Sequence, residues 1–322
     1  MNRELRRCPN CDAIEYINII TVTPSHFVPL NQSYCENVLE VLGVDPNEPF
    51  PIVRCRLCGF QYSLYILASD LLHKLYNQCI DLVTSQSKIY KVYKRRDYIQ
   101  IWNTLFYLWS GGKNDETINV RLLDYGCGWG DFMMTAHIPG LTCIGLEYDR
   151  RKSAYVKELG FDVVDSHDDL VGMAPFDLFF CNQVLEHVSQ PKMVIRKINS
   201  CSSMGAYGFI GVPDFSSENI EIVIDSFRKG RLMSKNINPW EHLNYFTPGS
   251  LVRMLHDSGF RVIQSNQCGA LKFFLRDAKR YMRLKQDRVC EWLSGFFGNT
   301  INESCQCIHN RTTLFVQKIR EI

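Results

Sequence analysis

Three glycines alternate within the segment Leu122–Asp131, where an apolar stretch gives way to a helical pattern. Glycines at such a turn permit positive φ angles and let a ligand lie directly against the backbone. Gly126, Gly128 and Gly130 follow the spacing G-x-G-x-G, which differs from the G-x-G-x-x-G of dinucleotide-binding folds. Asp124 precedes the first glycine by two positions. A carboxylate there suits a ligand with an ammonium or sulfonium group better than it suits a pyrophosphate.

A second acidic residue ends the next apolar stretch. Glu147 lies 21 residues after Gly126. A carboxylate at the end of the second strand of a parallel sheet can accept two hydrogen bonds from the hydroxyls of a ribose. The glycine turn and this strand end together predict a ligand that contains adenosine.

Two Cys-x-x-Cys pairs lie near the N-terminus, Cys8 with Cys11 and Cys55 with Cys58. Each pair places two thiolates on one tight turn, and two such turns complete a tetrahedral zinc site. The 43 residues between the pairs exceed the usual spacing of a zinc ribbon. We interpret the four cysteines as ligands of a structural Zn²⁺, with free thiols as the alternative.

Another group of potential ligands lies near the C-terminus, at Cys305, Cys307 and His309. This short pattern either holds a metal or is incidental. The remaining cysteines are scattered, as expected for small buried residues in a reducing compartment.

Alternating short strands and helices from residue 119 onward predict an α/β fold with a Rossmann-like, doubly wound, mostly parallel seven-stranded sheet. The strands are expected at 119–125, 141–147, 161–164, 176–182, 206–212, 260–265 and 312–318. The expected helices include 150–159, 248–258 and an amphipathic basic stretch at 271–298.

The chain divides into three expected regions. Residues 1–62 form the zinc-binding module, and residues 63–118 form a helical linker or cap in which leucines from Leu64 to Leu75 recur at helical spacing. Residues 119–322 form the α/β domain, with a candidate substrate loop inserted at 214–247.

Composition and charge exclude several classes of protein. The 322 residues carry a formal net charge of +2, which gives no global attraction to nucleic acid. No apolar run approaches the roughly 18 residues of a membrane span, and the N-terminus lacks the apolar core of a signal peptide. We therefore expect a cytoplasmic protein without a membrane partner.

The glycine-rich segment resembles the first signature of class I S-adenosylmethionine-dependent methyltransferases, and the match extends in order over roughly residues 119–265. Asp177–Val188 resembles the fourth-strand signature of the same superfamily. Glu241–Pro248 resembles a later signature, typical of the branch that methylates small molecules and sugars. The resemblance implies a methyltransferase that uses S-adenosylmethionine.

The resemblance also implies which residues bind that cofactor. Those at the glycine turn would hold its methionine end, and the others would contact its ribose, adenine or sulfonium. The residues are Asp124, Tyr125, Gly126, Gly128 and Gly130 at the turn, Glu147 for the ribose, Tyr148, Asp165 and Ser166 for the adenine, and Asn182 and Gln183 beside the sulfonium.

Methyl transfer to a hydroxyl or a carbon acid needs a base, and two histidines are candidates. His187 follows the fourth strand, at the sheet edge where ligands bind, and His242 lies in the inserted loop. The alternative for His187 is a structural histidine that caps the following helix. Gln183 stands where some ubiquinone-pathway O-methyltransferases have a metal-binding glutamate, which argues against a catalytic metal.

A zinc module ahead of such a domain resembles the arrangement of bacterial sugar C-methyltransferases. The main hypothesis is therefore in-line methyl transfer to the oxygen or carbon of a small molecule, either a sugar or nucleotide sugar or a precursor of a polysaccharide or secondary metabolite. A second hypothesis is an RNA or protein methyltransferase that uses the zinc module and the basic segments Lys91–Arg96 and Arg276–Arg288, which are otherwise solvated helix faces. A third is a non-catalytic protein that keeps the fold and the cofactor pocket.

Overall fold

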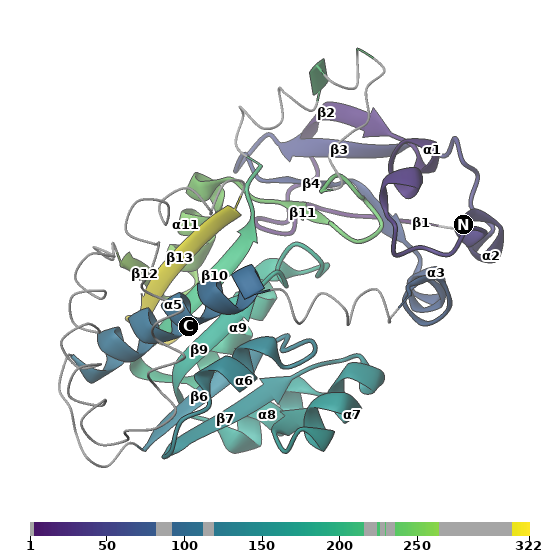
Figure 1. The fold of residues 1–322 in the computed structure, drawn as a ribbon. Helices are drawn as coiled ribbons and strands as arrows, with labels where there is room; N and C mark the ends of the chain where they lie inside the picture. Colours follow the sequence, from purple (N-terminus) through teal and green to yellow (C-terminus); the bar gives the residue numbers. More distant parts are fainter. Residues whose placement is uncertain are drawn as a thin grey trace.

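The computed structural model of the chain describes residues 3–81, 92–111, 119–215, 224–225, 229, 236–263 and 311–322. Within them lie a seven-stranded sheet, a four-stranded sheet and a two-stranded sheet (Figure 1). None of the helices in these ranges is long and apolar enough to cross a membrane. The predictions for 271–298, for Cys305, Cys307 and His309, and for half of the 214–247 insert lie outside the described residues.

The seven-stranded sheet has the order β12-β13-β10-β9-β6-β7-β8. Its strands are β6 (Val120–Tyr125), β7 (Leu141–Leu146), β8 (Asp162–Val164), β9 (Phe176–Asn182), β10 (Ser202–Pro213), β12 (Phe260–Ile263) and β13 (Arg311–Lys318). The strands from β10 to β8 pair in parallel, and β13 is antiparallel to both of its neighbours. The chain order reverses between β6 and β9, which makes this edge the expected ligand-binding switch point. The predicted α/β class and mostly parallel sheet are confirmed.

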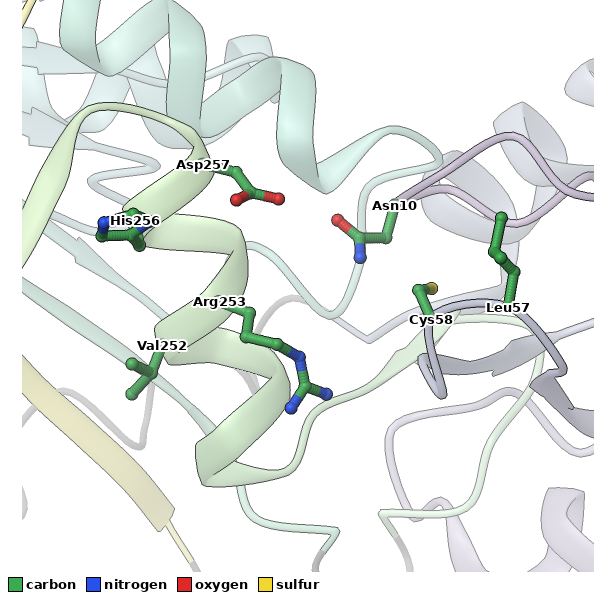
Figure 2. A pocket seen from close by; sticks show the side chains of 7 residues that line it. All are labelled: Asn10, Leu57, Cys58, Val252, Arg253, His256 and Asp257. Carbon is green, nitrogen blue, oxygen red and sulfur yellow. The ribbon is translucent and has the colours of Figure 1, made fainter.

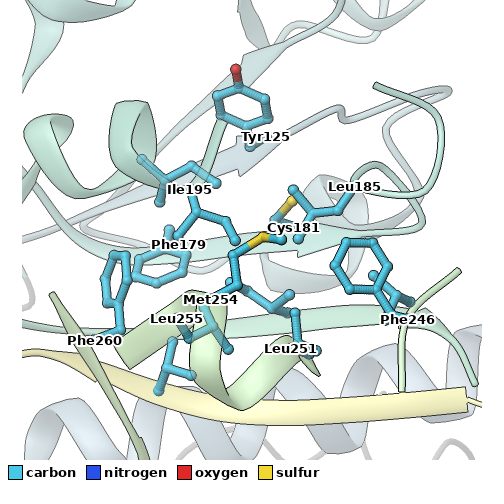
Figure 3. Packing of buried hydrophobic residues seen from close by; sticks show 14 of the residues in the cluster. Tyr125, Phe179, Cys181, Leu185, Ile195, Phe246, Leu251, Met254, Leu255 and Phe260 are labelled. Carbon is cyan, nitrogen blue, oxygen red and sulfur yellow. The ribbon is translucent and has the colours of Figure 1, made fainter. Parts of the chain in front are cut away.

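Helices cover both faces of this sheet, because successive side chains of its central strands point to opposite sides. The bounds of these helices are α5 (Val92–Ser110), α6 (Asp131–Ala136), α7 (Arg150–Glu158), α8 (His167–Met173), α9 (Pro191–Cys201) and α11 (Pro248–Asp257). On one face, Phe180 of β9 stacks on Phe132 of α6 with ring centroids 3.7 Å apart. On the other face, Phe179 joins the cluster that includes Ile195 of α9 and Leu251 of α11 (Figure 3).

The N-terminal part of the chain forms the two smaller sheets. The four-stranded sheet has the order β11-β4-β3-β2, and β1 pairs with β5. The bounds are β1 (Arg3–Leu5), β2 (Tyr16–Val22), α1 (Pro24–Phe27), the 3₁₀ turn η1 (Val28–Leu30), α2 (Val38–Leu42), β3 (Phe50–Cys55), β4 (Gln61–Ser63), β5 (Tyr65–Leu67), α3 (Ser69–Lys74), the π-helical turn η2 (Leu75–Cys79) and β11 (Asn244–Tyr245). Strand β11 comes from far along the chain, so this part is not built from N-terminal residues alone.

The predicted helical region begins later than its leucine spacing indicated. Leu67 lies in β5, where it pairs with Arg3 of β1, and the chain turns helical only at Ser69. A spacing of three to four residues at Leu64 and Leu67 is too short a sample to separate a helix from a strand, and pairing with the distant β1 decides the outcome. The rest of the region holds α3 and the long helix α5, as expected.

Candidate functional site

The glycine turn joins β6 to α6 and is open above its middle residue. Gly126 and Gly128 have φ values of +79° and +57°, a region that favours glycine. A Cβ on Gly126 would lie 2.4 Å from Cγ2 of Val184, so the turn packs directly against the segment that follows β9. A Cβ on Gly128 would meet nothing within 4 Å among the described residues. That open space is where a ligand can approach the bare backbone.

Glu147 closes one side of this turn. Its Oε2 accepts a hydrogen bond from the backbone N–H of Gly128 at 2.9 Å, and its Oε1 accepts one from the N–H of Asp149 at 2.9 Å. The carboxylate is therefore fixed in orientation at the end of β7, as the prediction of a ribose contact requires. Each oxygen keeps a further lone pair for a ligand hydroxyl.

Asp124 is a buried acid at the end of β6. It is 1% exposed, and its Oδ2 has no hydrogen-bond partner among the described residues. Burial, together with the negative charges of Glu147 and Asp131, raises the pKa of Asp124 well above its ordinary value. A cationic ligand beside it would favour the ionised form and would supply the missing donor. The residues at this turn therefore fit an S-adenosylmethionine, whose amino and sulfonium groups are both positive.

The remaining predicted cofactor residues surround the same edge of the sheet. Tyr148 is 59% exposed after β7, as a surface aromatic beside an adenine would be. The side chain of Tyr125 instead lies in the core, and burial with the neighbouring Tyr148 raises its pKa. Asp165 is exposed after β8, whereas the hydroxyl of Ser166 accepts from Asp169 N as the N-cap of α8. Because the hydroxyl of Ser166 is already engaged, a ligand would contact this residue through its backbone.

Asn182 and Gln183 end β9 beside the glycine turn. Gln183 has a φ of +59°, uncommon for a residue with a side chain, and its backbone N–H donates to the carbonyl of Gly211 at 2.8 Å. Its Nε2 is buried without a hydrogen-bond partner among the described residues. A strained backbone that carries an unpaired amide at a sheet edge is typical of a binding position.

The two candidate bases lie together. The ring centroids of His187 and His242 are 4.8 Å apart, although 54 residues separate them along the chain. Nδ1 of His187 is 2.9 Å from the carbonyl oxygen of Glu241, and Nδ1 of His242 is 2.8 Å from that of Asn236. Because a carbonyl can only accept, both rings carry their proton on Nδ1 and keep a lone pair on Nε2. Nδ1 of His187 thus binds the loop that carries Glu241.

Burial keeps both imidazoles neutral. It lowers the pKa of His187 to about 3, with a further contribution from the adjacent His242. It also lowers the pKa of His242. The Nε2 lone pairs are therefore unprotonated at neutral pH, and the same burial makes each ring a weaker base than a free imidazole.

A hydrogen-bonded network behind His242 was not predicted. Oε2 of Glu241 accepts from the hydroxyl of Tyr34 at 2.6 Å and from Nδ2 of Asn31 and of Asn238 at 2.8 Å each. Burial, followed by the charge of Glu241, raises the pKa of Tyr34 well above its ordinary value. Nothing in the spacing of Asn31 and Tyr34 marks them, and the only sequence signal is that Glu241 precedes a candidate base.

Tyr76 is a half-buried tyrosine of the turn η2. Burial raises its pKa, and the nearby carboxylates Glu241, Glu147 and Glu186 raise it further. Its backbone oxygen accepts a hydrogen bond from Nη2 of Arg151 in α7 at 3.0 Å. The backbone of this tyrosine is therefore joined to α7, and carboxylates of both sides of the site act on its hydroxyl.

The structure brings the four N-terminal cysteines together, and their Sγ atoms all lie within 4.8 Å of one another. The Sγ atoms of Cys8 and Cys58 are 3.5 Å apart, as are those of Cys11 and Cys55. Thiolates on a tetrahedral zinc with Zn–S bonds of about 2.3 Å would lie about 3.8 Å apart. The donor set and its geometry fit Zn²⁺.

One other group among the described residues could hold a cation. The ligand atoms of Glu186, His187 and His242 also lie within 4.8 Å of one another. Oε1 of Glu186 is 3.8 Å from Nε2 of His187. This trio belongs to the site already described.

A cavity of about 520 Å³ lies elsewhere, between the cysteine turns and α11. Figure 2 shows the residues that line it, which are Asn10, Leu57, Cys58, Val252, Arg253, His256 and Asp257. None of them belongs to the predicted cofactor set or to the histidine pair, so this cavity is not the candidate methyl-transfer site.

Comparisons with known proteins bear on the family. A family model described as "Methyltransferase domain" matches residues 71–265. No curated protein matches the chain. Among solved structures, the plantazolicin methyltransferase BamL, in complex with a triazolic desmethylPZN analog and S-adenosylhomocysteine, is 14% identical with a TM-score of 0.48, over 77% of this chain and 94% of that one.

Two further structures are similar at the same level. Magnesium protoporphyrin IX methyltransferase from Synechocystis PCC 6803 is 12% identical with a TM-score of 0.45, over 78% of this chain and 100% of that one. An S-adenosylmethionine-dependent methyltransferase from Mesorhizobium loti is 15% identical with a TM-score of 0.38, over 68% of this chain and 98% of that one. At these TM-scores the likenesses carry no argument about the acceptor.

The family model spans more than half of the chain, and its range includes the glycine turn, Glu147 and the histidine pair. The chain therefore belongs to the methyltransferase-domain family, with the class I S-adenosylmethionine-dependent methyltransferase fold.

Proposed function

We propose that this protein transfers a methyl group from S-adenosylmethionine to a hydroxyl or an acidic carbon of a small molecule, with a nucleotide sugar as the leading candidate. The observation that carries the proposal is the neutral pair His187 and His242, 4.8 Å apart, beside the glycine turn. A site that only had to position a thiolate would not need two proton acceptors. A hydroxyl or carbon-acid acceptor does need one.

The glycine turn, Asp124 and Glu147 would hold the cofactor. Asp124 would accept from its amino group, and Glu147 would accept from the ribose hydroxyls. When bound, the cofactor supplies an electrophilic methyl group on a sulfonium and departs as a neutral thioether. Asn182 and Gln183, at the end of β9, would orient the sulfonium toward the acceptor.

We assign the proton-accepting role to His242. Among the described residues no hydrogen bond engages its Nε2, whereas Nε2 of His187 lies 3.8 Å from Glu186. The acceptor's nucleophilic atom would bond to the methyl carbon as the carbon–sulfur bond breaks, and the acceptor's proton would move to Nε2 of His242. The carbonyl of Asn236, which fixes Nδ1–H, would stabilise the resulting imidazolium.

The acceptor side favours a neutral, hydroxyl-bearing ligand. Its polar groups are tyrosines, asparagines and two histidines, together with the fully buried Glu186 and with Glu241, which three donors already engage. A ligand rich in hydroxyls can both donate to and accept from such groups, as a sugar does. Nucleic acid is less favoured, because the formal net charge is only +2.

We further propose that Cys8, Cys11, Cys55 and Cys58 hold a structural Zn²⁺. Four thiolates would fill a tetrahedral site, so this ion would have no position open for substrate. Elemental analysis of untreated protein tests this assignment, and a zinc content far below one ion per chain would contradict it.

Calorimetric titration with S-adenosylmethionine and S-adenosylhomocysteine tests the first step of the proposal. A panel of nucleotide sugars and small phenols, with formation of S-adenosylhomocysteine as the readout, tests the second. Turnover with a nucleotide sugar that disappears in the His242→Ala protein would support the proposal. Wild-type turnover in that variant would remove His242 as the base.

A further inference from the structure

The loop that carries His242 is also a strand of the N-terminal sheet. Two residues after this histidine, β11 pairs with β4, with Asn244 opposite Tyr62 and Tyr245 opposite Gln61. The backbone N–H of Ser63 donates to the carbonyl of Leu243 at 3.0 Å. The position of His242 is therefore set partly by the cysteine-bearing part of the chain and not only by the methyltransferase sheet.

Arg6 strengthens this connection with its forked guanidinium. Its Nη1 donates to the carbonyl of Leu243 at 2.7 Å, and its Nη2 donates to Oδ1 of Asn244 at 2.9 Å. The same Nη2 donates to the carbonyl of Ser189 at 2.8 Å. Leu243 follows His242 by one residue and Ser189 follows His187 by two, so one side chain holds both histidine loops.

Asn244 completes the connection from the other side. Its Nδ2 donates to the carbonyls of Leu185 and Val188 at 2.7 Å each, and these two residues flank the segment of Glu186 and His187. The backbone N–H groups of Leu243 and Asn244 both donate to the carbonyl of Glu186, at 2.6 and 3.2 Å. Asn244 is fully buried, so water cannot replace these hydrogen bonds.

The cysteine cluster in turn fixes Arg6. The backbone N–H of Arg6 donates to the carbonyl of Leu64 at 2.9 Å, directly after β4. Two residues later Cys8 lies within 3.5 Å of Cys58, which ties this end of the chain to the turn between β3 and β4. The backbone that carries this guanidinium is thus held at Arg6 itself, by Leu64, and at Cys8, by the cysteine cluster.

We propose that Arg6 and Asn244 are positioning residues for methyl transfer, which set the geometry of His187 and His242, and that the cysteine module acts in the reaction by holding Arg6. The role assigned to the histidines rests on the proposed function. Neither residue touches the predicted cofactor set, so they would act on the acceptor side alone. A displacement of about 1 Å at a reacting group can cost about 100-fold in rate.

The test compares Arg6→Ala and Arg6→Lys with the control Arg7→Ala. Arg7 is adjacent, and among the described residues it forms an exposed ion pair with Asp12. Histidine labelled with ¹⁵N would report the tautomer of each ring in the full-length, S-adenosylhomocysteine-saturated protein, with assignments from His187→Gln and His242→Gln. Zinc content and circular dichroism would establish that each variant is folded.

We expect wild-type protein and Arg7→Ala to show both rings as Nδ1–H tautomers. In Arg6→Ala both signals should move toward the averaged values of a mobile imidazole, and kcat should fall about tenfold to 100-fold. Affinity for S-adenosylhomocysteine should stay within about twofold. Arg6→Lys keeps the positive charge but lacks the forked guanidinium. Its ring signals and its kcat should therefore lie between those of wild type and of Arg6→Ala. Unchanged tautomer signals in folded Arg6→Ala protein would overturn the proposal.

Asn244→Asp decides the matter if Arg6→Ala does not fold. This variant keeps an acceptor for Arg6 and loses both hydrogen bonds donated to Leu185 and Val188. The His187 signal should then move, and an unmoved signal would overturn the proposal. The tautomer readout needs no acceptor and no turnover. If His242→Ala retains full turnover, the proposed function fails while this readout still decides whether Arg6 and Asn244 position the two rings.

Discussion

The turn and strand end that would hold the methionine and ribose of the cofactor come from one continuous stretch of chain, whereas the acceptor side is assembled from four separate segments. Asp124, the glycine turn and Glu147 lie within 24 residues, on two strands that pair directly. The acceptor side combines residues 31–34, 76, 185–189 and 236–244. Local chemistry thus defines the first side, and long-range packing between two sheets defines the second. A change in the N-terminal part should therefore damage one side and spare the other.

The largest expected effect comes from removing two of the cysteines. Cys55→Ser together with Cys58→Ser should abolish stoichiometric zinc, and the N-terminal sheet should lose its order, because a structural zinc can contribute on the order of 10 kcal/mol to folding. Turnover should fall below detection while S-adenosylhomocysteine still binds. Elemental analysis, calorimetry and activity measure the three quantities.

A half-buried cysteine outside the cluster supplies the control for this experiment. Cys143→Ser, on β7, should keep both zinc and turnover. If the double variant keeps wild-type turnover, the two sides of the site do not depend on the cysteine module, and the comparison drawn above is wrong.

Replacing the proposed base, His242, should have the second-largest effect. His242→Ala should lower kcat by about 10²- to 10⁴-fold, the usual range for loss of a general base, without a change in cofactor affinity. The exposed His256 of α11 offers a matched control, and His256→Ala should behave as wild type. A fall in cofactor affinity equal to the fall in kcat would mean that His242 belongs to the cofactor side.

Removing the charge of Glu147 should have a smaller effect, on the opposite side. Glu147→Gln keeps the shape but weakens hydrogen bonds to the ribose, each worth about 1.5–3 kcal/mol when one partner is charged. Affinity for S-adenosylmethionine should therefore fall about 10- to 100-fold by calorimetry. The exposed Asp162 at the start of β8 provides the control Asp162→Asn. Unchanged affinity in Glu147→Gln would exclude the ribose contact.

The contrast between local motifs and long-range packing also explains which parts of the fold and of the site could be predicted from the sequence. The strand β9 was predicted at its observed bounds, since its run of apolar residues is buried on both faces and needs no partner beyond the sheet to be recognised. The glycine turn and Glu147 were found because their spacing is local. The four cysteines were found because each pair is a local motif, even though the sequence alone cannot bring the two pairs together.

Apart from the two histidines, the residues of the acceptor side were not predicted, because they are far apart in the sequence and no local motif joins them. Tyr34 and Glu241 are 207 residues apart, and no periodicity links them. Strand β11 has two residues, too few for a strand pattern, and it exists because β4 offers an open edge beside it. The leucines at the start of the predicted helical region were misassigned for the same reason, since pairing with β1 overrode their spacing.

The smallest expected effect is the pH dependence of stability that the buried histidines impose. The pKa of His187 in the folded chain is lowered to about 3 by burial, against about 6.5 for an unfolded histidine. Below pH 6.5 the unfolded chain takes up a proton that the folded chain refuses, so acidification destabilises the fold through this residue. The contribution is fully present above pH 6.5 and is lost progressively as the pH falls toward 3. Urea unfolding of wild type and His187→Gln between pH 7.5 and 5 should therefore show a shallower loss of stability in the variant. Parallel curves for the two proteins would mean that His187 has the same pKa in the folded and the unfolded chain. That result would contradict the lowered pKa of the neutral pair on which the acceptor side depends.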